Sequence, residues 1–122
     1  MEQAKAQTAI VVEDDPLIAM MIVSEIQDLG WSVQGTAQNE SAALELLKAR
    51  TPDLALLDVK LGASNSMAIA TFCKQIGIPI LFLTGYVASD LPPECIDAPV
   101  LAKPFSSSDL RISIGRALAH TG

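Results

Sequence analysis

Leu54-Ala55-Leu56-Leu57-Asp58 is the stretch that decides the fold. Four apolar residues are followed by a carboxylate, which is the pattern of a buried strand whose last side chain emerges at the edge of a sheet. A second apolar run, Thr8-Ala9-Ile10-Val11-Val12, is followed in the same way by Glu13 and Asp14. If these two strands are neighbours in a parallel sheet, their three carboxylates share one pocket.

Segments with strand and helix periodicity alternate along the chain. Apolar runs predict strands at residues 8–12, 31–36, 54–58, 80–84 and 100–102. Helical spacing predicts helices at residues 16–29, 40–50, 67–76 and from 106 onward, the last beginning with the capping-box pattern Ser-Ser-Ser-Asp. Because crossovers between parallel strands are right-handed, the helices cover both faces of the sheet. We therefore expect an α/β domain with a doubly wound, five-stranded parallel sheet.

The sequence also gives specific expectations for the segment after the fourth strand and for the first helix. Between residues 85 and 98, Pro92 and Pro93 leave little room for a helix, so a loop or one short turn is expected in place of a full fourth helix. In the first helix, Met20 and Met21 are expected to fill the core.

Length, charge and cysteine content narrow the class of protein. The chain has 122 residues, enough for one domain with a full core, and its net charge of −6 argues against direct nucleic-acid binding. Cys73 and Cys95 have neither metal-site spacing nor a disulfide pattern, which favours a reducing compartment. The sequence contains no leader-like segment and no apolar run of membrane-spanning length, so a cytoplasmic protein that does not bind membranes is expected.

Polar side chains follow the predicted strands at the edge where an α/β sheet places its chemistry. They are Glu13, Asp14, Asp58, Thr84 and Lys103. Three carboxylates at close range either keep protons at a raised pKa or bind a cation that neutralises them. Because the set contains oxygen ligands only, a hard ion is favoured, and Mg²⁺ fits a site of one or two carboxylates.

An aspartate beside Mg²⁺ can act as a nucleophile toward a phosphoryl group and form an aspartyl phosphate. The negative charge on the phosphoryl oxygens must then be met by donors. Lys103 supplies a positive charge and Thr84 a hydroxyl. Each electrostatic need of such a reaction at Asp58 therefore has one candidate side chain.

The arrangement resembles the receiver domains of response regulators. The matching elements are the acidic pair after the first strand, Asp58 after the third, Thr84 after the fourth and Lys103-Pro104 after the fifth. The resemblance spans nearly the whole chain, and the joint pattern is far more specific than any single element. It implies a flavodoxin-like sheet with strand order 2-1-3-4-5, and one receiver domain over residues 1–122 without an output domain.

The resemblance also implies a role for each matching residue. Asp58 is the expected phosphoacceptor, assisted by Thr84 and Lys103. Mg²⁺ is expected to bind the acidic pair, Asp58 and the backbone carbonyl of Lys60. The Lys103-Pro104 bond is commonly cis in that family.

The implied function is a step in two-component signalling. A histidine kinase or a histidine phosphotransfer protein donates the phosphoryl group, and a downstream protein partner recognises the changed surface. The domain would catalyse only its own phosphorylation and dephosphorylation, so it is not expected to be an enzyme with a separate substrate.

A subgroup of receivers, the FAT GUY group, is similar in more detail. The similar stretches are Pro79-Ile80-Leu81-Phe82-Leu83-Thr84-Gly85-Tyr86, Leu91-Pro92, and Pro99-Val100-Leu101-Ala102-Lys103-Pro104-Phe105. Leu83 departs from the group, which has alanine at that position. Members of this group often stand alone without an output domain, and their fourth helix is reduced or mobile. The irregular composition of residues 85–98 agrees with that property.

The segment that reports phosphorylation is expected to be unusual. Most receivers carry Tyr or Phe three residues before the conserved lysine, and this chain has Val100 there. Tyr86, two residues after Thr84, is the nearby aromatic that could replace it, together with the loop over residues 85–98 and the bond to Pro104. The alternative for Tyr86 is a half-buried ring that only packs.

Other functions place different demands on the same residues. A phosphatase of the haloacid-dehalogenase type also uses an aspartyl nucleophile and Mg²⁺, but it needs a second Asp where this chain has Lys60. A docking domain that works without phosphorylation would not need Asp58, Thr84 and Lys103 together. A receiver excised from a hybrid histidine kinase, or a receiver that acts as a phosphate sink, is compatible with every residue named.

Overall fold

The fold is built on one five-stranded parallel sheet. The computed structural model describes residues 7–62, 64–85 and 98–119. The strands are β1 (Thr8–Val12), β2 (Ser32–Ala37), β3 (Leu54–Asp58), β6 (Ile80–Thr84) and β7 (Val100–Ala102). They are arranged in the order β2-β1-β3-β6-β7, and every neighbouring pair is parallel. The predicted doubly wound sheet and its order, 2-1-3-4-5 when only these strands are counted, are confirmed.

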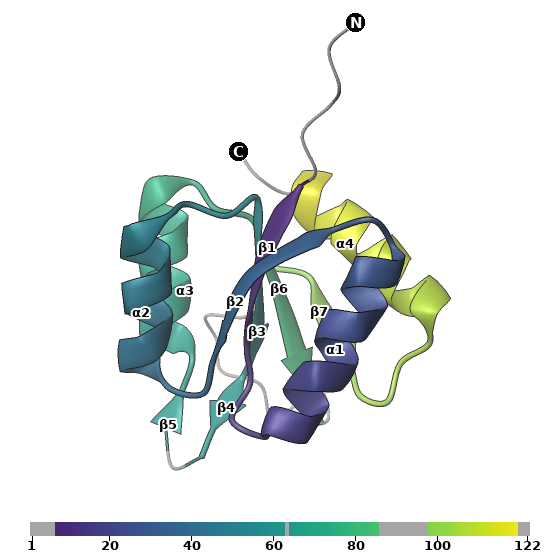
Figure 1. The fold of residues 1–122 in the computed structure, drawn as a ribbon, viewed down its shortest axis with the longest axis horizontal. Helices are drawn as coiled ribbons and strands as arrows, with labels where there is room; N and C mark the ends of the chain where they lie inside the picture. Colours follow the sequence, from purple (N-terminus) through teal and green to yellow (C-terminus); the bar gives the residue numbers. More distant parts are fainter. Residues whose placement is uncertain (1–6, 63, 86–97, 120–122) are drawn as a thin grey trace, which may run out of the picture.

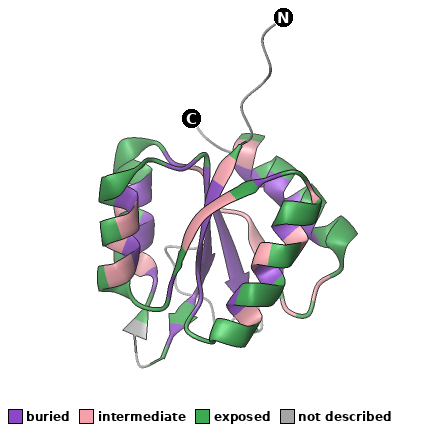
Figure 2. Cartoon of the chain, in the orientation of Figure 1, coloured by how far each residue is buried: buried purple, intermediate pink, exposed green. Residues whose placement is uncertain are grey.

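Helices cover both faces of this sheet (Figure 1). On one face lie α2 (Glu40–Ala49) and α3 (Met67–Ile76), and on the other lie α1 (Pro16–Asp28) and α4 (Ser107–Ala119). The buried surface follows the same division, because each helix turns its buried side to the sheet and its exposed side outward (Figure 2).

Strand β3 shows why this sequence requires two helical layers. Alternate side chains of a strand point to opposite faces. Leu54 and Leu56 accordingly pack with the core on the α1 and α4 face, whereas Ala55 and Leu57 pack with the core on the α2 and α3 face. All four are fully buried, so β3 is the centre of both cores.

The predicted helix and strand boundaries are close to those observed. β2 begins at Ser32 rather than at the preceding tryptophan, and α1 ends at Asp28, one residue early. The predicted cap of the last helix is present, because the Asp109 backbone N–H donates to Ser106 Oγ at 3.0 Å and Ser106 N–H donates to Asp109 Oδ2 at 3.2 Å. α2 likewise ends at Ala49 rather than at residue 50.

One element was not expected from the sequence. A short antiparallel hairpin, β4 (Lys60–Leu61) and β5 (Ser64–Asn65), lies between β3 and α3. Its turn contains Gly62, whose φ of +59° is a conformation that favours glycine. The polar composition of this stretch had indicated only a connection to the helix.

The expected burial of the two methionines of α1 is wrong. Met20 is 68 % exposed and Met21 is 63 % exposed, and Leu17 beside them is 67 % exposed. The sheet-facing side of α1 is instead formed by Ala19, Ile22 and Ile26. An apolar ridge, Leu17, Met20 and Met21, is therefore open to solvent at the start of α1.

Several expectations fall on the chain between β6 and β7. The predicted loop in place of a full fourth helix falls mostly on residues 86–97, which lie outside the described residues, as do Tyr86 and Cys95.

In the part of the chain that is described, no helix has the length and apolar composition needed to cross a membrane.

Candidate functional site

The register of the parallel strands aligns the ends that carry the polar residues. Asp58, the last residue of β3, pairs with Leu83 of β6, and Thr84, the last residue of β6, pairs with Ala102 of β7. The Lys103 backbone N–H continues this ladder by donating to Thr84 O at 2.8 Å. Strand ends that are far apart in the sequence therefore meet at one edge of the sheet, called here the carboxyl edge.

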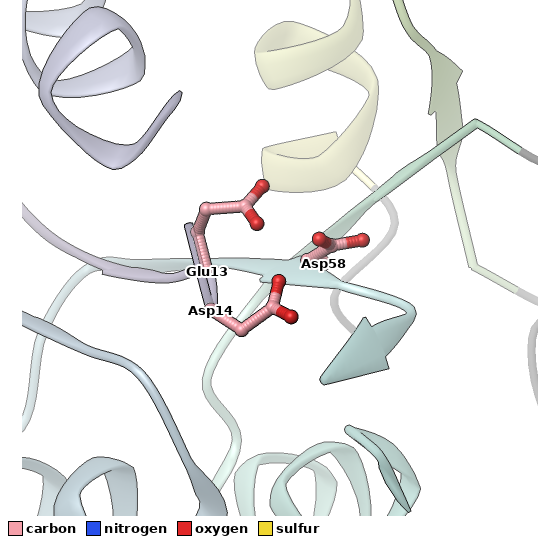
Figure 3. A group of neighbouring side chains, drawn as sticks. All are labelled: Glu13, Asp14 and Asp58. Carbon is pink, nitrogen blue, oxygen red and sulfur yellow. The ribbon is translucent and has the colours of Figure 1, made fainter. Parts of the chain in front are cut away.

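Three carboxylates gather at this edge (Figure 3). Glu13 and Asp14 follow β1, and Asp58 ends the adjacent strand β3. One oxygen from each lies within 4.8 Å of the other two. Glu13 is 1 % exposed and Asp58 is 7 % exposed, whereas Asp14 is open to solvent. The pocket predicted from the two apolar runs is therefore present, and Asp14 forms its open side.

One cation faces these acids. Lys103 Nζ lies 2.6 Å from Glu13 Oε1 and 3.2 Å from Asp58 Oδ2. The lysine reaches inward from the end of β7, and its bond to Pro104 is cis. Among the described residues, one lysine pairs with acids of this pocket, and three carboxylates against it leave excess negative charge.

The excess charge is reflected in the proton affinities. Burial raises the pKa of Glu13 to about 7, against the opposing effect of Lys103. Burial would lower the pKa of Lys103, but its hydrogen bond to Glu13 and the charges of Asp58 and Glu13 outweigh burial and raise it. The neighbouring Glu13 and the Gly62 N–H lower the pKa of Asp14. Glu13 therefore holds a proton easily, while Asp14 and Lys103 are charged.

The remaining predicted residues lie at or near the same edge. Thr84 is 2 % exposed, and Lys60 lies in the hairpin that follows Asp58, with its side chain in solvent. Val100 is half-buried against the core, and its backbone pairs with Phe82. The aromatic ring common at this position in receivers is therefore replaced by a small aliphatic side chain that packs.

Two features near the site were not found from the sequence. The first is Gly62, whose backbone N–H donates to Asp14 Oδ2 at 2.9 Å. A glycine in a polar stretch four residues after Asp58 was the available signal, because glycine often marks a turn with positive φ. The second is the contact of Lys103 with Glu13, which nothing in the spacing of the sequence indicates.

A groove adjoins the pocket on the α1 side. Its volume is about 400 Å³. The lining residues are Ile18, Met21, Ile22, Glu25, Lys103, Pro104 and Phe105. Lys103 belongs to both the groove and the acidic pocket, so a molecule bound in the groove would contact the lysine that pairs with Asp58.

The donors in the pocket suit a hard divalent cation. Glu13, Asp14 and Asp58 present oxygen atoms only, and Asp14 leaves the site open to solvent on one side. Mg²⁺ favours such a site because it keeps several of its waters. The residues present therefore fit the metal expected from the sequence.

A family model places the chain among known domains. The model of the response regulator receiver domain matches residues 9–115. The phyllosphere-induced regulator PhyR of Methylorubrum extorquens is 32 % identical over 117 residues, which are 93 % of this chain and 44 % of that protein. The transcriptional regulatory protein PdtaR of Mycobacterium tuberculosis is 32 % identical over 124 residues, with coverages of 98 % and 60 %. The chain thus spans about half the length of these relatives.

Solved structures give the same result. SdrG from Sphingomonas melonis superposes with a TM-score of 0.84 at 30 % identity, and the match covers 95 % of this chain and 99 % of that one. The receiver domain of PhyR from Erythrobacter litoralis gives a TM-score of 0.79 at 27 % identity, with coverages of 96 % and 93 %.

Proposed function

Because the chain belongs to the response regulator receiver domains of two-component signalling, we propose that Asp58 accepts a phosphoryl group from a phosphohistidine on a kinase or a phosphotransfer protein. One observation carries the proposal: Asp58 shares its pocket with two further acids and with Lys103 Nζ at 3.2 Å. In this reaction an Asp58 carboxylate oxygen forms the new bond to phosphorus, and the imidazole of the donor leaves. The domain has no substrate other than its own aspartate.

Each neighbouring side chain has a defined task in this proposal. Lys103 moves its ammonium group from Asp58 to a phosphoryl oxygen, and the buried Thr84 hydroxyl donates to another. Mg²⁺ would bind Asp14, Asp58 and the Lys60 carbonyl, with Glu13 alongside, and when bound it neutralises charge on the phosphoryl oxygens. Glu13 keeps Lys103 at this edge of the sheet through the 2.6 Å ion pair.

The phosphodonor is proposed to dock on α1 and the adjoining groove. The ridge of Leu17, Met20 and Met21 is exposed, and the groove beside it leads to Lys103. No lysine or arginine occurs between Lys5 and Lys48, whereas seven acids do. An apolar surface flanked by acids fits a partner helix with an apolar stripe and basic residues.

A pair of variants tests this docking surface. Met21→Glu is expected to slow phosphoryl transfer from a protein donor at least about tenfold, because burying one methionine side chain is worth about 1.5–3 kcal/mol, and about 1.4 kcal/mol is a factor of ten. Transfer from a small phosphodonor should not change. Ile112→Glu is the matched control, since Ile112 is an apolar residue of α4 that is 53 % exposed and does not line the groove. Equal slowing by both variants would contradict the assignment.

The output is proposed to be a protein–protein interaction in the cytoplasm. With Val100 in place of the usual aromatic ring, the readout is assigned to Tyr86 and residues 85–98, supported by the sequence similarity to single-domain receivers with an unusual segment there. The excess of acidic residues supports a protein target over nucleic acid. A receiver of a hybrid kinase and a phosphate sink would use the same pocket chemistry.

The phosphorylation itself is tested with a small phosphodonor and Mg²⁺. The protein is expected to gain one phosphoryl group, which is lost on treatment with hydroxylamine and maps to Asp58. Asp58→Asn should gain none. Asp53→Asn, at the other end of the same strand, is the matched control and should be modified like the parent protein. A phosphoryl group on any other residue, or none, would overturn the proposal.

A further inference from the structure

The backbone of Gly62 makes a hydrogen bond across a long stretch of sequence. Its N–H donates to Asp14 Oδ2 at 2.9 Å, from the turn of the β4–β5 hairpin to the residue that forms the open side of the pocket. A carboxylate has two oxygens. When one accepts from Gly62, the other stays available for a metal, and the plane of the carboxylate is fixed.

The hairpin is itself anchored, so Gly62 is a fixed donor. Lys60 pairs with Asn65, and Leu61, which is 4 % exposed, is part of the core on the α2 and α3 face. At the far end, Asn65 Oδ1 accepts from the Met67 N–H of α3 at 3.0 Å. Ser66 N–H also donates to the carbonyl of the residue after Asp58, at 3.1 Å. A tethered turn therefore constrains an otherwise exposed side chain.

We propose that the Gly62 N–H is a positioning group that sets the Mg²⁺ affinity of this site. It orients Asp14 before the metal arrives, and it connects Asp14 to the hairpin whose Lys60 carbonyl is the proposed third protein ligand. Hydrogen bonds to ligating carboxylates commonly control metal affinity in this way. The inference rests on the proposed Mg²⁺ site, but it concerns a residue outside the ligand set.

The local backbone shows which substitution preserves the donor. Gly62 has a φ of +59°, and a Cβ built on it would lie 4.0 Å from Asp14 Oδ2, which is ordinary contact. Asparagine adopts this conformation more readily than other residues with side chains and keeps the N–H. Gly62→Asn should therefore retain the function of the position.

The direct test removes the N–H without changing a side chain, by replacing the amide with an ester in a protein assembled from synthetic segments. Gly62→glycolate ester is expected to bind Mg²⁺ about 10- to 100-fold more weakly in a calorimetric titration without phosphodonor. Gly62→Asn should bind within about threefold of the parent, a change of less than 1 kcal/mol. Gly30→glycolate ester is the matched control, because Gly30 also has a positive φ and donates a 3.0 Å turn hydrogen bond, and it should bind like the parent.

A second measurement uses the protein without chemical synthesis. Amide hydrogen exchange at Gly62 should be slow in metal-free parent protein and at least about tenfold faster in Asp14→Ala, because a lost hydrogen bond of 1.4 kcal/mol changes an opening equilibrium tenfold. Unchanged exchange, or parent-like Mg²⁺ binding by the Gly62 ester, would overturn the inference. If the parent itself bound no Mg²⁺, the metal site under "Proposed function" would fail instead.

Discussion

Asp53 and Asp58 stand at opposite ends of the same strand and serve different purposes. Asp53 precedes β3 at the amino edge of the sheet, where its Oδ2 accepts from the Thr8 backbone N–H at 2.8 Å and from Thr8 Oγ1 at 3.3 Å. Asp58 ends β3 at the carboxyl edge, 7 % exposed beside two more acids. The Asp53 carboxylate is exposed and accepts from uncharged groups of Thr8. The Asp58 carboxylate instead shares the ammonium group of Lys103 with Glu13.

The comparison shows that residue type alone does not mark a functional site. A carboxylate whose hydrogen bonds are satisfied locally stabilises the fold, as Asp53 does. A group of carboxylates that lacks enough donors and cations is costly unless a ligand completes it. The carboxyl edge is therefore where metal and phosphoryl chemistry is expected.

The largest expected effect is a dependence of stability on pH that originates at the carboxyl edge. The pKa of Glu13 is about 7 in the folded protein, against 4.5, the ordinary value of a glutamate, in the unfolded chain. Its stabilising contribution is therefore complete below pH 4.5 and is lost as pH rises through 7. In EDTA, the free energy of unfolding should fall by at most about 3 kcal/mol between pH 5 and pH 8.

Glu13→Gln should flatten this profile, measured by thermal or urea unfolding at each pH. The stabilising contribution of Asp14, whose pKa is lowered, is present across this window and is lost only in more acidic solution. That of Lys103, whose pKa is raised, is lost only in more alkaline solution, so neither changes between pH 5 and pH 8. A stability that rises from pH 5 to pH 8 in the parent protein would contradict the role of Glu13.

The next effect is stabilisation by Mg²⁺. At a concentration 100 times its Kd, the ion should raise the free energy of unfolding by about 2.7 kcal/mol. Asp53→Asn should keep the whole increase, and Asp58→Asn should lose most of it, as followed by calorimetric melting. Equal responses of the two variants would remove the distinction between the two edges.

The smallest effect is a difference in sign between the same two variants without metal. Asp58→Asn removes one charge from a crowded pocket, while Lys103 keeps its closer partner Glu13, so stability should rise by about 1 kcal/mol. Asp53→Asn weakens charge-assisted hydrogen bonds to Thr8 and should lower stability by less than about 1 kcal/mol. Urea unfolding in EDTA measures both, and a shift of both variants in the same direction would break the comparison.

Much of this architecture was predictable because the sheet is buried on both faces. The continuous apolar run before Asp58 could form only a central strand, and the polar residues after each strand had to meet at one edge once the strands were parallel. The exposed Met20 and Met21 were not predictable from helical spacing, because an apolar ridge that faces solvent has the same residue types as one that faces the core.

The side-chain contacts inside the acidic pocket were harder to predict from the sequence. Lys103 could be placed at the carboxyl edge, but its closer contact with Glu13 than with Asp58 depends on side-chain length and packing. The Gly62 hydrogen bond depends on the β4–β5 hairpin, whose strands have only two residues each. Strands this short leave almost no alternation of apolar and polar residues in the sequence. Tertiary geometry decides these details.

The most direct test is an NMR titration of the ¹⁵N-labelled protein with Mg²⁺ and beryllofluoride, which mimics a phosphoryl group on an aspartate. Amide shifts are expected to cluster at Glu13, Asp58, Thr84 and Lys103, while Thr8 and Asp53 do not move. Asp58→Asn is expected to abolish the beryllofluoride response. An absent response in the parent protein, or one as large at Thr8 and Asp53 as at Asp58, would contradict the role of Asp58 as phosphoacceptor.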